Sequence, residues 1–298
     1  MAKAEASLTE RLVPVPMPER QLVSTGDIPP TAGRVRSLGV VHRGARLFMW
    51  GREESADRMI VAVLRGKKHV LEIMDAGGDG VFANVTHFHR DTVRSQYFNA
   101  IAAAALRAFA DSRPGRQTRV LEVGAGVGGT TGAALEALPA QRSTYHFTDL
   151  SSAFFSFARE QFGRYGWVRY GTYDMNTDPA TCGLERSSFD AVLGANAVHC
   201  ARELKVTLTH LCRLLVPGGI LVLRELTAPR PAHAMIPGLI PGFSDYRDQR
   251  SEVGSPLLSI DDWCCALEAT RFDAVCALPH PQAASLGEHL ILARRSDD

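Results

Sequence analysis

The sequence of 298 residues lacks the patterns that identify several large classes of protein. Its six cysteines include no C-x-x-C pair, and no group of cysteine and histidine has the spacing of a zinc site. No apolar run approaches the roughly 18 residues that span a bilayer, and residues 1–21 lack the apolar core of a signal peptide. We therefore expect a reduced, cytoplasmic protein with no metal site.

An excess of charge of either sign is also lacking. The chain has 33 Lys and Arg against 32 Asp and Glu, which gives a net charge of +1. A protein that binds nucleic acid or a membrane surface usually carries a clear basic excess, so neither partner is indicated. The 45% hydrophobic and 22% charged residues are ordinary globular values, and they predict a substantial buried core.

Three segments of the chain differ in their pattern. Residues 1–32 are rich in proline and charge, which predicts an extended and flexible arm. Residues 33–112 contain short β-like runs and then an alanine-rich helical pattern from Asp91, a plausible N-cap, to about Ala110. We expect this segment to form a small β-rich and helical lid or substrate region. Residues 113–298 predict the cofactor-binding domain.

His87 and His89 form an H-x-H pair within one of the β-like runs. Two histidines with this spacing lie on the same side of a strand, as metal ligands do, but the sequence offers no third ligand for them. We expect both to be exposed strand residues.

From about residue 119 onward, short apolar runs alternate with helical patterns. This rhythm predicts an α/β fold, with a doubly wound and mostly parallel sheet that is covered by helices on both faces. The last two runs, "RFDAVCAL" and "EHLILARR", lie close together in the sequence. They predict an antiparallel pair of strands.

A glycine-rich loop, "VGAGVGGTT", follows the first of these strands. Gly124, Gly126 and Gly129 satisfy the G-x-G-x-x-G pattern of dinucleotide-binding proteins, so a nicotinamide-dependent dehydrogenase is one alternative. Glycine at such positions permits a tight turn and lets a ligand approach the backbone closely. The pattern predicts a nucleotide-like cofactor here but does not by itself identify it.

Three acidic residues favour S-adenosylmethionine. Glu122, two residues before the loop, would crowd a pyrophosphate but suits the ammonium group of a zwitterionic ligand. Asp149 ends the next strand, where it can accept hydrogen bonds from both ribose hydroxyls. Asp174, followed by the apolar Met175, suits an adenine amino group and ring face, although a strand-end cap has the same residue type. The carboxyl ends of parallel strands meet at one edge, so these side chains would surround one ligand. Further candidate contacts of the cofactor are Ala125, Leu150, Asn196 and Tyr97, of which Tyr97 equally suits the core.

The segments "VLEVGAGVGGTT", "FTDLS", "FDAVLGANAVH" and "LLVPGGILVLRELT" resemble the C-methyltransferase domains of polyketide synthases, and the resemblance covers about residues 60–295. It implies the seven-stranded class I methyltransferase fold and methylation of the α-carbon of a β-ketoacyl thioester on an acyl carrier protein. It also implies a catalytic histidine–glutamate pair, and the matching residues are His199 and Glu225. Imidazole oriented by a carboxylate is a suitable base for such an acidic carbon.

The chain departs from this family in residues 240–250, "IPGFSDYRDQR", which stand where a tryptophan-rich segment is usual. Tyr246 and Arg247 are candidate substrate contacts, whereas surface charge is the stronger interpretation of Arg247 and Arg250. A histidine–glutamate pair would deprotonate a phenol equally well. An O- or N-methyltransferase of free secondary metabolites therefore remains an alternative, as does a catalytically silent fold that binds a partner.

Overall fold

The computed structural model describes residues 86–228, 245–279 and 287–297. The expected flexible arm (residues 1–32) and the β-like runs up to residue 85 lie outside the described residues. The strands are β1 (Thr118–Val123), β2 (Ser143–Asp149), β3 (Val168–Thr172), β4 (Phe189–Ala195), β5 (Leu215–Leu226), β6 (Phe272–Leu278) and β7 (Glu288–Arg295). The α-helices are α6 (Val93–Asp111), α7 (Thr131–Ala137), α8 (Phe154–Phe162), α9 (Leu204–Leu214), α11 (Arg250–Val253) and α12 (Ile260–Glu268). The shorter helical turns are η1 (His87–Asp91), η2 (Ala140–Arg142), η3 (Pro179–Cys182) and η4 (Val198–Cys200).

The seven strands form one sheet in the order β3-β2-β1-β4-β5-β7-β6. Strands β1 to β5 pair in parallel, whereas β7 runs antiparallel to both of its neighbours, β5 and β6. The predicted α/β fold, its mostly parallel sheet and its antiparallel terminal pair are confirmed. The order reverses between β1 and β4, and ligands of such sheets bind outside the carboxyl ends of the strands at that point.

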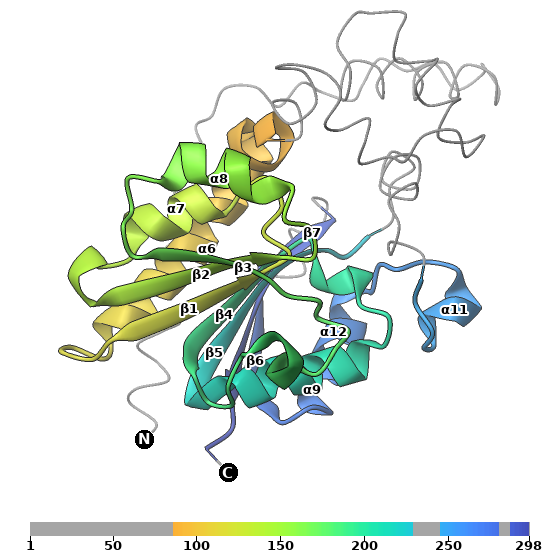
Figure 1. The fold of residues 1–298 in the computed structure, drawn as a ribbon. Helices are drawn as coiled ribbons and strands as arrows, with labels where there is room; N and C mark the ends of the chain where they lie inside the picture. The colour runs from red at the N-terminus through yellow and green to blue at the C-terminus, as the bar shows by residue number, and fades with distance from the viewer. Residues whose placement is uncertain (1–85, 229–244, 280–286, 298) are drawn as a thin grey trace, which may run out of the picture.

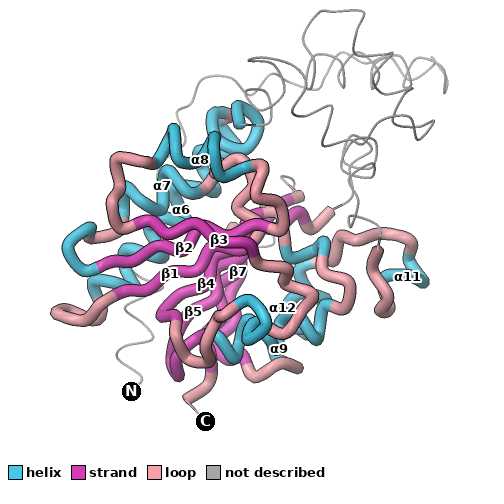
Figure 2. The backbone as a smooth tube through the Cα atoms, viewed as in Figure 1, coloured by secondary structure: helices cyan, strands magenta, loops and turns pink. Residues whose placement is uncertain are grey.

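Helices cover both faces of the sheet (Figure 1). Helices α6, α7 and α8 lie together on one face, and α9 and α12 lie on the other, so the strands form the middle layer (Figure 2). Successive residues of a central strand enter opposite cores: Val222 of β5 belongs to the core beneath α6 to α8, whereas Leu221 and Leu223 belong to the core beneath α9 and α12. Burial on both faces explains why the central strands are mostly apolar, with charged residues only near their ends.

Two features of residues 87–92 differ from the sequence predictions. The N-cap of α6 is Thr92, whose side chain accepts a hydrogen bond from the Ser95 backbone at 3.2 Å, and not Asp91. Asp91 instead ends the π-helical turn η1, which contains His87 and His89. The prediction that these histidines lie on a strand was therefore wrong. Threonine and aspartate are both preferred N-cap residues, so residue type alone could not locate the first turn.

Within residues 86–228, 245–279 and 287–297, no helix is both long and apolar enough to cross a membrane. The same residues contain no group of three or more His, Cys, Asp or Glu side chains that could hold a metal ion.

Candidate active site

The glycine-rich loop leaves the carboxyl end of β1 and turns sharply into α7. Gly124, Gly126 and Gly128 have φ values of +61°, +54° and +73°, which favour glycine. A Cβ atom on Gly124 would lie 2.5 Å from the Cβ atom of Ala197, whereas a Cβ on Gly126 would meet no atom within 4 Å. Gly124 therefore lets two backbone segments pack closely, and Gly126 faces open space that a ligand can enter.

Asp149, at the end of β2, holds this loop. Its Oδ2 atom accepts a hydrogen bond from the Gly126 backbone at 2.9 Å, and Oδ1 accepts one from Ser151 at 2.9 Å. Burial raises the pKa of the Asp149 carboxyl, although these backbone donors oppose the shift. The next residue, Leu150, has 67% of its surface exposed. An exposed leucine beside an anchored carboxylate suits the flat apolar face of a nucleoside base.

Glu122 lies beneath the loop and is almost completely buried. Its Oε2 atom accepts hydrogen bonds from the hydroxyl groups of Thr131 at 2.6 Å and Tyr145 at 2.7 Å. Burial raises the pKa of this carboxyl to about 7, and the two hydroxyls only partly offset the effect. Glu122 therefore changes its charge near neutral pH while it supports the first turn of α7.

Asp174 and Met175 follow β3 and lie at the same edge of the sheet. The Oδ1 atom of Asp174 accepts hydrogen bonds from the backbone and the side chain of Asn176, at 2.9 and 3.0 Å. The Met175 methyl lies 3.8 Å from the position of a Cβ atom on Gly124, so its side chain adjoins the loop. Asp174 lies two residues beyond the strand end, and one oxygen already caps its own turn.

Asn196 directly follows β4, and Tyr97 lies on α6. Asn196 has a φ of +52°, and its side chain accepts from the Leu226 backbone at 3.1 Å and donates to Glu288 at 3.2 Å. It thereby joins the ends of β4, β5 and β7. Tyr97, on α6, is half-buried and packs edge-on against Phe98, with ring centroids 5.2 Å apart.

His199 and Glu225 meet directly. The Nδ1 atom of His199 lies 2.6 Å from Oε2 of Glu225, and both side chains are buried. The other carboxylate oxygen accepts a hydrogen bond from the backbone of Val198 at 2.9 Å, which fixes the carboxylate. Burial alone would lower the pKa of His199, but Cys200 and Glu225 outweigh it and raise the pKa well above the ordinary value. The pair has the geometry of a base with an orienting carboxylate.

Comparison with known proteins assigns the family. Residues 121–221 match a family model described as a methyltransferase domain. The chain is 34% identical over 208 residues to highly reducing polyketide synthase lcsB of Purpureocillium lilacinum, over 65% of this chain and 8% of that protein. It is similar to the crystal structure of the CurJ carbon methyltransferase, with 30% identity and a TM-score of 0.75, over 88% of this chain and 70% of that chain. The chain belongs to the carbon methyltransferases of polyketide synthase type.

The cofactor of this methyltransferase is S-adenosylmethionine. The structure of trans-methyltransferase CalH, which is 25% identical with a TM-score of 0.63 over 80% of this chain and 64% of that chain, is a complex with S-adenosylhomocysteine. The residues at the loop fit such a ligand, because Gly126 faces open space beside the Asp149 carboxylate and the exposed Leu150. The dehydrogenase alternative is thereby set aside.

A buried polar network that the sequence did not reveal contacts the glycine-rich loop. Arg224, buried on β5, forms a salt bridge with Glu288 at 2.7 Å and donates to Asn99 at 2.8 Å. Asn99 in turn accepts from Thr130 at 2.7 Å and donates to the backbone of Gly129 at 2.9 Å. Buried charges of this kind are tolerated only when every partner is present. Neither alternation nor spacing marks such residues, because their partners come from distant elements.

Residues 245–250 form a strap against the loop that carries His199. Arg250 is almost completely buried and donates to the backbone carbonyls of His199 at 2.8 Å and Ala201 at 2.6 Å. Asp248 pairs with Arg250 at 2.7 Å and accepts from the Leu204 backbone at 2.9 Å. The expectation that Arg250 is a surface charge was wrong, because two backbone carbonyls and a carboxylate satisfy its guanidinium in the interior.

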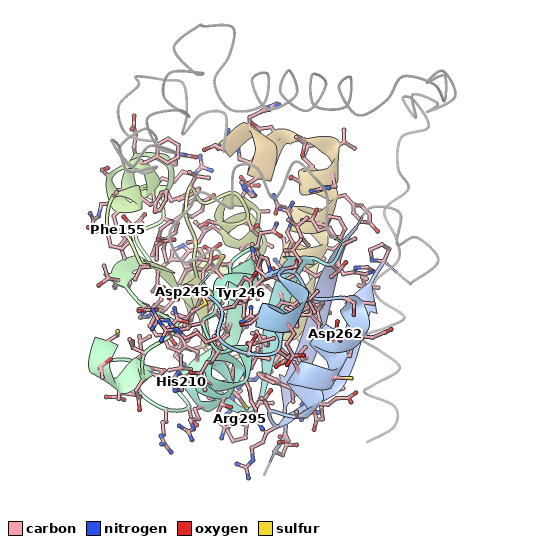
Figure 3. The ribbon with its side chains drawn as sticks, turned by 90° about the vertical axis from the view of Figure 1, so that its right-hand side faces the viewer. Phe155, His210, Asp245, Tyr246, Asp262 and Arg295 are labelled. Carbon is pink, nitrogen blue, oxygen red and sulfur yellow. The ribbon has the colours of Figure 1, made fainter. Side chains whose placement is uncertain are left out.

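The two candidate substrate residues lie on this strap. In the view of Figure 3, Asp245 and Tyr246 lie near the middle of the picture, well above Arg295 at the lower end of β7. Tyr246 is half-buried, with its ring 5.5 Å from the Arg250 guanidinium carbon. Arg247 is exposed, as expected of a surface charge, and its backbone donates to the Arg202 carbonyl at 2.7 Å.

Proposed function

We propose that this methyltransferase transfers a methyl group to the α-carbon of a β-ketoacyl thioester, with His199 as the base and Glu225 as its orienting partner. The observation that carries the proposal is the buried contact of 2.6 Å between Nδ1 of His199 and Glu225. A carbon between a ketone and a thioester is acidic enough for imidazole to deprotonate, and a positioned base typically contributes about 10²–10⁴-fold.

Different residues of the chain would hold the base and bind the cofactor. The carboxylate of Glu225 holds the His199 ring by Nδ1, so Nε2 is the nitrogen that receives the proton, and the carboxylate stabilises the imidazolium that forms. Asp149, the loop around Gly126 and Leu150 would bind the cofactor, together with Glu122, Gly124, Ala125, Asp174, Met175, Asn196 and Tyr97. When bound, its sulfonium supplies an already activated methyl group.

We further propose an acyl carrier protein as the partner that delivers the acceptor, with Tyr246 and Arg247 on the delivery side. The match to a polyketide synthase supports this partner, although the chain corresponds to only 8% of the length of lcsB. The division into an arm (1–32), a lid region (33–112) and a cofactor domain (113–298) stays a prediction. A cytoplasmic location also stays a prediction, supported by six free cysteines.

The test offers the purified protein a carrier-bound β-ketoacyl thioester and, separately, free phenols and amines, with labelled S-adenosylmethionine. We expect mass spectrometry to detect one added methyl on the thioester, and fragmentation to locate it on the α-carbon. The variant His199→Ala should retain S-adenosylhomocysteine binding but lose turnover by about 10²-fold or more. Methylation of the phenols or amines alone would instead support the alternative O- or N-methyltransferase, with the same pair as its base.

A further inference from the structure

A second histidine lies beside the His199–Glu225 pair. In the antiparallel ladder of β5 and β7, His289 is the register partner of Glu225. Side chains directly opposite one another in such a ladder lie on the same face, with Cβ atoms about 5 Å apart. Ile291, two residues beyond His289 on β7, belongs to the core under α9 and α12, which is therefore also the face of His289. The chain thus places two histidines around one glutamate.

Among the described residues, one ring nitrogen of His289 has a hydrogen-bond partner and the other has none. Its Nδ1 atom lies 2.6 Å from the hydroxyl oxygen of Thr227, which directly follows β5 and is two residues beyond Glu225. The Nε2 atom is buried and has no hydrogen-bond partner among the residues that the structure describes, and His289 is only 3% exposed. Leaving a buried polar nitrogen unpaired costs about 1–3 kcal/mol. At an active site, a bound ligand can supply the missing hydrogen-bond partner of such a nitrogen.

The surroundings keep this ring neutral. Burial lowers the pKa of His289, and the neighbouring Glu288 only partly opposes the shift. Glu288 faces the other side of β7, where Arg224 and Arg94 pair with its two oxygens at 2.7 and 2.8 Å. When the Thr227 hydroxyl donates to Nδ1, the single proton of the neutral ring resides on Nε2. The free nitrogen is then a hydrogen-bond donor.

We propose that His289 binds the methyl acceptor, and that its Nε2–H donates to the acceptor oxygen that becomes negatively charged on deprotonation. This inference rests on the proposed C-methylation. His199 removes the proton from the α-carbon, and the electron pair of that C–H bond moves onto the carbonyl oxygen to give an enolate. The enolate carbon then forms a bond to the methyl group of S-adenosylmethionine, and the sulfur keeps the electrons of the broken S–CH₃ bond.

A donor at this position stabilises the charge that develops as the proton leaves. Removing one such donor from a water-poor site typically lowers the rate by about 10²–10³-fold. Because His289 is neutral, it does not compete with His199 for the negative charge of Glu225. That carboxylate can therefore stabilise the His199 imidazolium. The two histidines thus act on opposite ends of the same step, one on the proton and the other on the oxygen.

Two variants separate this role from a structural one. The amide nitrogen of glutamine can occupy the position of Nε2, whereas the shorter asparagine reaches only the position of Nδ1 and preserves the contact with Thr227. We expect His289→Asn to lose turnover by about 10²-fold, and His289→Gln to stay within about 10-fold of the wild type. Both should bind S-adenosylhomocysteine with unchanged affinity. His146 on β2, whose register partners are Leu121 and Arg169, gives the matched control, and its Asn and Gln variants should keep full turnover.

A second readout follows enolisation without methyl transfer. In D₂O, with S-adenosylhomocysteine in place of the methyl donor, mass spectrometry measures deuterium uptake at the α-carbon above the uncatalysed rate. His289→Asn should slow this exchange as much as it slows turnover. In the wild-type protein, the Nε2 proton resonance of His289, assigned by its absence in His289→Asn, should shift when the acceptor is added. The shift itself is measured on the wild-type protein and does not depend on the activity of a variant.

The outcomes distinguish the two proposals. If the wild type neither exchanges nor methylates the β-ketoacyl thioester, the proposed C-methylation is wrong. If the wild type does both and His289→Asn matches it, or His289→Gln loses more activity than His289→Asn, then His289 serves only Thr227 and the inference is overturned. An unchanged Nε2 resonance in the presence of the acceptor overturns it as well.

Discussion

Arg250 donates a hydrogen bond to the backbone carbonyl of His199 over 2.8 Å, so a residue 51 positions away fixes the loop that carries the proposed base. The same guanidinium reaches the carbonyl of Ala201 and pairs with Asp248. The imidazole itself is held by Glu225, and the backbone that bears it is held by Arg250. Side chain and backbone are therefore positioned by different parts of the chain.

The first prediction concerns this contact. Arg250→Ala should lower the free energy of unfolding by about 3–5 kcal/mol, because it leaves Asp248 and two buried carbonyls without their partner. Turnover should fall while S-adenosylhomocysteine affinity changes little, since the cofactor loop lies elsewhere. Arg247→Ala is the matched control: its side chain is 65% exposed, and its loss should cost less than about 0.5 kcal/mol. Denaturant unfolding and calorimetric titration measure both effects. Equal stabilities of the two variants would contradict the burial of Arg250.

The second prediction concerns pH. As the proposed base, His199 can accept a proton only in its neutral form, and its pKa is raised well above the ordinary value. The kcat/KM of the wild type should therefore rise with pH through an acid limb centred above about 6.5. Glu225→Gln removes the carboxylate charge, so the limb should move to lower pH while the plateau falls by about 10²-fold. A limb that stays in place in Glu225→Gln would show that another group titrates.

The third prediction concerns Glu122. Its pKa is about 7 in the folded protein against 4.5 as the ordinary value, so the folded chain keeps a proton that the unfolded chain loses between these pH values. The free energy of unfolding should therefore fall as pH rises through this window, by on the order of 3 kcal/mol. Glu122→Gln should remove that fall. Glu136→Gln, at an exposed position on α7, should keep it. Urea unfolding of the three proteins at pH 5 and pH 8 provides the comparison, and parallel curves for wild type and Glu122→Gln would refute the assignment.

The fourth prediction separates two roles of glycine in the loop. Gly124→Ala should destabilise the fold by several kcal/mol, because its Cβ would overlap with Ala197 and φ is positive. Gly126→Ala should cost only about 1–2 kcal/mol, since its φ is positive but no atom lies near. Its Cβ would instead intrude on the cofactor, so S-adenosylhomocysteine affinity should fall at least about 10-fold. Thermal melting with and without the ligand tests the pair. Normal ligand affinity in Gly126→Ala would place the cofactor elsewhere.

The parts of the site that the sequence predicted are those that depend on local pattern. The loop around Gly124 and the carboxylate of Asp149 follow from strand ends, and parallel strands place their ends at one edge. The contact between His199 and Glu225 follows in the same way, because β4 and β5 are adjacent. The proposed catalytic use of this contact came from the family resemblance and not from the pattern.

The parts that the sequence did not predict depend on contacts between distant segments. Arg250 is a charged residue in a polar segment, and only the carbonyls of the folded His199 loop make its burial favourable. His289 is the strand-register partner of Glu225, which lies 64 positions earlier in the sequence. The register of β7 on β5 cannot be read from alternation alone. The N-cap of α6 is Thr92 and not the adjacent Asp91, and only the backbone geometry distinguishes these two positions.

The insertion of β7 between β5 and β6 also sets the order of events during synthesis. β7 is the last of the seven strands to leave the ribosome, yet it fills an interior position of the sheet. Until residues 288–295 emerge, the side of β5 that will bind β7 has unpaired backbone groups, which favour association with other chains. Nascent chains that stall before residue 288 should therefore depend on chaperones, and they would contain His199 and Glu225 without His289.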